Sequence, residues 1–93
     1  MMNGFQSIRD GVHKRIHDAT CEYVRKGGKE NRRYMVHLMH VYADFALDCG
    51  QRTPEKFLKD EGLFERFCTE RKLGLRTKED YKRTCCLLLK LIK

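Results

Sequence analysis

The sequence predicts an all-α fold, a compact bundle of four main helices. Apolar residues recur with a period close to 3.6 along the chain, and no convincing stretch alternates between apolar and polar residues. The composition, 41% hydrophobic and 35% charged, is typical of a globular protein. Ninety-three residues provide for one core, so we expect a single domain over residues 1–93, with residues 1–6 as an N-terminal tail.

The first two helices are expected over Ser7–Lys26 and Asn31–Cys49. Gly27 and Gly28 should end the first, because glycine readily adopts the left-handed conformation that follows a helix. Asn31 is a favourable N-cap for the second helix, and Gly50 is expected to stop it. The second helix has the wider apolar face, so we expect it to be central and most buried: Met35, Leu38, Val41, Tyr42, Phe45, Ala46 and Cys49.

The third element opens at Thr53-Pro54-Glu55, a capping residue followed by a proline suited to the first helical position. Gly62 is expected to divide it into segments over 54–59 and 61–72, and Gly74 to close it. The fourth helix is expected to begin at Thr77, with Asp80 completing a variant capping box, and its apolar stripe runs to the end of the sequence.

The charge of the chain favours a polyanionic partner. Lysine and arginine total 20 against 13 acidic residues, which gives a net charge of +7 and a pI near 9.3. The longest unbroken apolar run, Cys85–Leu89, is far short of the ~20 residues that span a membrane. No targeting signal is recognisable, so we expect a cytoplasmic protein without a membrane partner.

Two groups of basic residues surround the first and last interhelical loops. If the loops share one side of the bundle, these side chains would contact DNA phosphates, with help from N–H groups at helix starts Asn31 and Thr77. The alternative is that the charges merely flank loops, as in many soluble bundles. The predicted DNA contacts are Lys29, Arg32, Arg33, Lys72, Arg76, Lys78, Lys82 and Arg83.

The last three helices carry a family resemblance across roughly residues 13–92. It lies in Asn31-Arg32-Arg33-Tyr34 before Leu38, Tyr42 and Phe45, in Thr53-Pro54-Glu55-Lys56-Phe57-Leu58, in Phe64 and Phe67, in Gly74-Leu75-Arg76-Thr77, and in Tyr81 with the leucines after Cys86. On these residues the chain resembles the core-binding domain of tyrosine recombinases, the SAM-like N-terminal domain of phage integrases.

That resemblance implies a four-helix clamp on duplex DNA around a recombination core site, with the second and fourth helices facing the DNA. In the family, catalysis belongs to a separate C-terminal domain, so the resemblance implies no enzymatic activity for this segment. The sequence departs from the family at the start of the last helix. Thr77 stands for the serine of a Ser-x-x-Thr motif, but Asp80 replaces the threonine, and an acid repels phosphate.

Other residue clusters offer weaker chemistry. His13, His17 and Cys21 share a helix face at steps of four, expected opposite the Ile8 stripe, and they have the residue types that bind zinc, although solvated histidines are the more common case. His40 and Asp44 could pair at i,i+4 like an oriented general base, but no nucleophile accompanies them. We therefore expect neither a metal, a cofactor nor a catalytic site.

The cysteines predict free thiols, and the C-terminal leucines predict a contact with another molecule. Five scattered cysteines argue against a disulfide framework, and Cys85-Cys86 are expected to pack rather than to react. The Leu87–Ile92 segment has more apolar residues than one small core can cover, which favours a homodimer or a protein partner. The chain is thus expected to bind DNA without catalysis; the alternative is a small mobile-element protein that modulates a larger protein.

Overall fold

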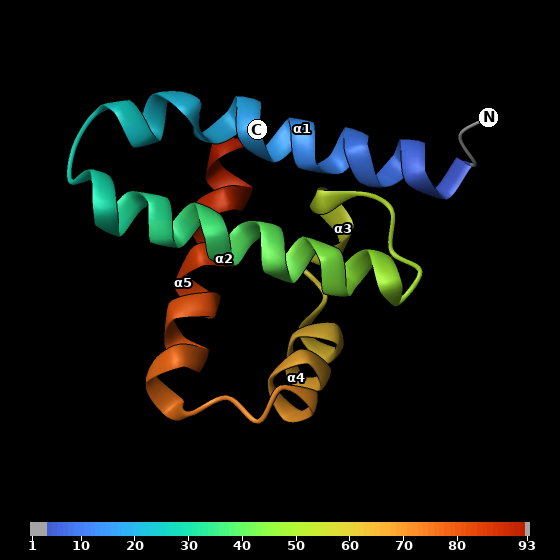
Figure 1. The fold of residues 1–93 in the computed structure, drawn as a ribbon. Helices are drawn as coiled ribbons and strands as arrows, with labels where there is room; N and C mark the ends of the chain where they lie inside the picture. Colours follow the sequence, from blue (N-terminus) through green and yellow to red (C-terminus); the bar gives the residue numbers. More distant parts are fainter. Residues whose placement is uncertain (1–3, 93) are drawn as a thin grey trace.

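The computed structural model describes residues 4–92, apart from the side chains of residues 4–6 and Lys29, and shows an all-α fold (Figure 1). The described chain contains no strand. Its five helices are α1 (Gly4–Arg25), α2 (Lys29–Asp48), α3 (Pro54–Phe57), α4 (Glu61–Glu70) and α5 (Leu75–Leu91). The predicted four-helix bundle is confirmed, with the third element divided as expected.

Two long antiparallel helices, α1 and α2, form one layer, and α5 crosses them beneath the N-terminal half of α2 (Figure 1). Helix α2 also contacts α4, which makes it the central helix. It has more buried residues than any other helix: Met35, Leu38, Met39, Tyr42, Ala43, Ala46 and Leu47. The predicted central position of the second helix is therefore confirmed.

The core is continuous across all five helices and has aromatic rings at its centre. Phe67 of α4 is fully buried, and its ring contacts Tyr42, Phe45 and Tyr81 edge to face at centroid distances of 5.0, 5.0 and 4.8 Å. Such edge-to-face pairs stabilise a core beyond the area they bury. Phe57 adds an edge contact to Tyr42 at 6.1 Å. Phe57 and Phe67 are thus core residues, and Phe64 is partly buried against the core.

Two of the three expected polar N-caps were wrong, because glycines take the positions expected for Asn31 and Thr77, whereas Thr53 is the N-cap of α3 as predicted. Helix α2 begins after Gly28 and α5 after Gly74, and each glycine carbonyl accepts the first helical hydrogen bond, from Arg32 N–H at 3.0 Å and Lys78 N–H at 2.9 Å. Asn31 and Thr77 therefore lie inside the first helical turns. Helix α1 begins by Gly4, which shortens the expected tail; residues 1–3 lie outside the described part.

Two helices end in the same hydrogen-bonded turn, known as the Schellman motif. At the end of α2 the left-handed position is Gly50, with φ at +93°, as predicted. At the end of α4 it is Lys72, with φ at +51°, where Leu73 N–H donates to Cys68 O at 3.1 Å. The prediction that Gly74 closes this helix was wrong, as was the left-handed conformation expected near Gly27, since Gly50 is the one described glycine with positive φ.

The C-terminal apolar segment packs against the core. Leu88 is fully buried, and Leu87, Leu91 and Ile92 are partly buried against the cluster. Most apolar residues of the segment therefore contact the core of this chain, and the homodimer or protein partner expected there stays a prediction. Of the helices described, none combines the length and the apolar character needed to cross a membrane.

Candidate nucleic-acid interface

A basic groove lies between α5 and the N-terminal half of α2. Its cavity volume is about 610 Å³, and α5 contributes one helical face to it at steps of four and three: Arg76, Asp80, Arg83, Leu87 and Lys90. Asn31, Tyr34 and Met35 of α2 and Tyr23 of α1 complete the lining, together with Cys86. Three cations face one acid here, so the groove is positively charged.

The seven-residue spacing places the three cations of this groove in a straight row. Each step of seven residues rises about 10.5 Å along an α-helix, so the row from Arg76 to Lys90 extends about 21 Å. All three side chains are exposed, and none forms an ion pair among the residues that the structure describes. We call Arg76, Arg83 and Lys90 the α5 basic row.

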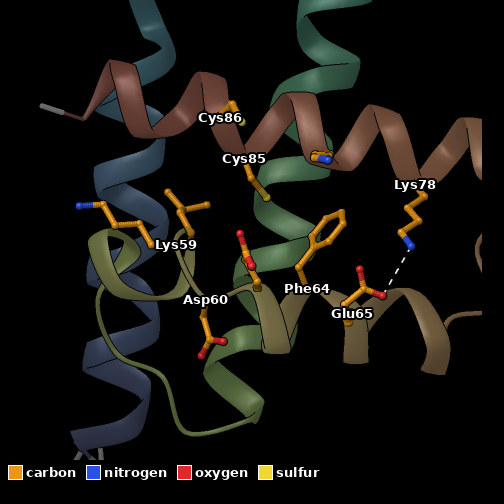
Figure 2. A pocket seen from close by; sticks show the side chains of 10 residues that line it. Lys59, Asp60, Phe64, Glu65, Lys78, Cys85 and Cys86 are labelled. Carbon is orange, nitrogen blue, oxygen red and sulfur yellow. Dashed lines mark ion pairs between the residues drawn. The ribbon is translucent and has the colours of Figure 1, made fainter.

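The second cavity, of about 580 Å³, lies on another side of α5, against α4 and the turn before it (Figure 2). It is electrically balanced: its cations Lys59, Lys78 and Lys82 face three acids, Asp60, Glu61 and Glu65. Lys78 reaches across to Glu65 at 3.5 Å (Figure 2). This balance makes the second cavity a poor site for a phosphate group.

The basic residues of α1 and α5 differ in their ion pairing. All four basic residues of α1 form an ion pair; an example is Arg15, which binds Glu55 of α3 through two hydrogen bonds of 2.9 and 2.6 Å. Of the five basic residues of α5, only Lys78 forms an ion pair within the described chain. Residues 71–92 hold seven basic and two acidic residues, a net +5 of the chain's +7. The free positive charge is therefore concentrated on and before α5.

Arg32, a predicted DNA contact, is engaged within the protein. Its guanidinium donates a 2.6 Å hydrogen bond to the carbonyl oxygen of Tyr23 and lies 4.4 Å from the centroid of the same residue's ring. A Cβ atom at Gly27 would lie only 3.1 Å from that guanidinium, so the glycine provides the space that the arginine occupies. Arg32 thus stabilises the end of α1 and is half-buried.

The remaining predicted contacts are distributed over several surfaces. Arg76 and Arg83 line the basic groove, whereas Lys78 and Lys82 line the balanced cavity. Arg33 and Lys72 are exposed, on α2 and on the loop before α5. The side chain of Lys29 lies outside the described part. Sequence reasoning missed Lys90, which the seven-residue spacing from Arg83 could have indicated.

Two of the four histidines, His13 and His40, meet at the α1–α2 interface. His13 was expected on the face of α1 opposite the apolar stripe. It instead contacts His40 and Asp44 of α2. Asp44 accepts from His13 and Arg9 rather than pairing with His40. Within residues 4–92, no three histidine, cysteine or acidic side chains are grouped so that they could hold a metal ion.

The five cysteines are free thiols, as expected. Burial raises the pKa of the Cys85 thiol to about 12, so this group stays protonated and unreactive at neutral pH. Cys86 differs from the prediction, because its side chain is exposed on the surface of α5. Core packing thus accounts for a cysteine at position 85 but not for the one at position 86.

Comparison with protein-family models, with characterised proteins and with solved structures found no match to this chain.

Proposed function

We propose that this protein binds duplex DNA through the α5 basic row and holds it without catalysis. The observation that carries the proposal is the ion pairing: Arg76, Arg83 and Lys90 are exposed and aligned, and none of them forms an ion pair among the described residues. Charges that the fold does not neutralise are available to an external polyanion. Arg33 and Lys72 extend the same proposal as flanking contacts.

The straightness of the row favours duplex over single-stranded DNA. A row of about 21 Å on one rigid helix corresponds to about six base pairs of duplex, at 3.4 Å per pair. Single-strand binders also present aromatic rings on which bases stack. Here Tyr34, at 43% exposure, is the one largely exposed aromatic side chain among those described.

The family resemblance agrees with the location of the groove. In the tyrosine-recombinase core-binding domain, the second and fourth helices face the DNA, and the helices in those sequence positions here, α2 and α5, line the basic groove. Asp80 lies between Arg76 and Arg83 on this face, at the position where the family has a threonine. We therefore expect Asp80 to weaken phosphate binding.

The proposal is tested by measuring duplex affinity at several salt concentrations. The triple variant R76Q/R83Q/K90Q should bind more weakly, and its slope of log affinity against log salt should be less steep by about 2.7, because three phosphate contacts are lost. D80N should bind more tightly than the wild type. Circular dichroism would show whether each variant keeps its helical signal.

A matched control removes the same number of charges elsewhere. Lys14, Arg52 and Lys56 are exposed and lie outside the basic groove, so K14Q/R52Q/K56Q lowers the net charge equally. It should keep nearly the wild-type salt slope. An equal loss of duplex affinity in both triple variants would mean that total charge, not the α5 basic row, governs binding. No duplex binding at low salt would refute the proposal and favour a protein partner.

A further inference from the structure

The N-terminal half of α1 is attached to the C-terminal half of α2 by a chain of polar contacts. His13 Nδ1 lies 2.6 Å from His40 Nδ1, and His13 Nε2 lies 2.7 Å from Asp44 Oδ1. Arg9 binds the same carboxylate and reaches Asp48 at 2.7 Å. The His13 and His40 rings are nearly parallel, at 18°, with centroids 4.9 Å apart. This network joins two helices through two titratable rings.

The number of protons that the ring pair can hold is limited by its geometry. Because the Asp44 carboxylate only accepts, His13 carries a proton on Nε2. Between the two facing Nδ1 atoms there is room for one proton, donated by either ring to the lone pair of the other. The pair can therefore hold its hydrogen bond when both rings are neutral or when one is charged. A second added proton would leave two N–H groups and two positive charges facing each other.

The surroundings of His40 make that second proton unfavourable. Burial is the first cause that lowers the pKa of His40, and the charge of His13 is the second. His17 of α1 and His37 of α2 act in the same direction, and the Asp44 carboxylate opposes them. Arg9 adds another positive charge that is bound to Asp44. Most of the titratable groups near His40 are therefore histidines or an arginine, and their positive charges disfavour a proton on His40.

We propose that His13 and His40 form a pH-sensitive latch, which holds the first half of α1 against α2 near neutral pH and releases it in the mildly acidic range. Release follows from protonation of both rings, which removes their hydrogen bond and replaces it with repulsion. Val12, the neighbour of His13, is buried in the core at 4% exposure, so opening the latch would bring core surface into contact with water.

The direction of the pH effect follows from proton binding. The unfolded chain binds a proton at His40 with an ordinary pKa near 6.5, whereas the folded chain binds it less readily. The unfolded state thus holds more protons in this range, and stability falls as the pH drops below 6.5 toward the lowered pKa of His40. Each tenfold weakening of proton binding at His40 in the folded chain, relative to the unfolded chain, corresponds to a Tm decrease of about 5–11 °C in a domain of this size.

Thermal unfolding between pH 7.5 and 5.0, in a buffer with a metal chelator, tests the latch. The wild type should lose Tm across this range. H40Q should lose much less, because the glutamine amide can donate to His13 Nδ1 but does not titrate. H37Q is the matched control: it removes an exposed histidine three residues away, whose effect on the pKa of His40 is the smallest of those named, and it should keep most of the wild-type pH dependence. Equal Tm losses in the wild type and H40Q would overturn the proposal.

A second measurement does not depend on the stability of any variant. NMR titration of the wild-type imidazole resonances should show the His40 ring taking up its proton below its ordinary pH range. Backbone amide shifts of residues 7–16 should change in the same step, while those of α5 stay constant. Protonation of His40 near pH 6.5, without amide changes in α1, would also overturn the latch.

Discussion

Replacing Arg32 should destabilise the protein, while replacing its neighbour Arg33 should not. Arg32 donates a charge-assisted hydrogen bond to the Tyr23 carbonyl and covers the ring of the same residue. A hydrogen bond to a charged group stabilises by about 1.5–3 kcal/mol, and a partly exposed cation–π contact by about 0.5–1 kcal/mol. For a half-buried side chain we expect R32A to cost about 2 kcal/mol, which lowers the Tm by about 8–16 °C.

The assay is chemical and thermal unfolding followed by circular dichroism, with R33A as the matched control. Arg33 is exposed and forms no ion pair in the described structure, so R33A should change stability by no more than about 0.5 kcal/mol. R32K keeps the positive charge but not the planar fork, and should lie between the wild type and R32A. Equal Tm values for R32A and R33A would refute the structural role of Arg32.

Two further predictions concern the core and the thiols. F67A removes the ring that three aromatic neighbours contact, so the free energy of unfolding should fall by about 3–5 kcal/mol in denaturant titration; a loss below 1 kcal/mol would contradict the central role of Phe67. Among adjacent cysteines, Cys86 should react with an aromatic disulfide reagent in the folded protein, whereas Cys85 should react only after unfolding; similar rates for both would show that the burial of Cys85 is wrong.

The helices could be predicted from the sequence because each has a continuous apolar stripe that core packing requires. Val12 and Ile16 in α1, and Tyr42 and Leu38 in α2, all follow from 3.6-residue spacing and are buried. Helix starts were harder to predict. Side-chain capping preferences favoured Asn31 and Thr77, but the helical hydrogen bonds begin earlier, at Gly28 and Gly74, which have no side chain that could signal a cap.

The candidate interface could be predicted only in part, because charge alone does not show which cations the fold neutralises. Arg32 and Lys78 were expected to contact DNA. In the structure Arg32 binds a carbonyl of α1, 9 residues away in sequence, and Lys78 pairs with an acid of α4, 13 residues away. Such pairings depend on tertiary packing. Lys90 was missed for the opposite reason, since it lies beyond the basic cluster in sequence but on the same face of α5.

The two Schellman turns differ in one respect that affects how the protein could be engineered. Glycine takes the left-handed position after α2 at no steric cost, but Lys72 takes it after α4, where a side chain costs about 1–2 kcal/mol. A glycine at position 72 would therefore relax the backbone while deleting a charge just ahead of α5. That single replacement would raise folding stability and lower the affinity for a polyanion. The lysine at position 72 therefore supplies a positive charge at the cost of backbone strain.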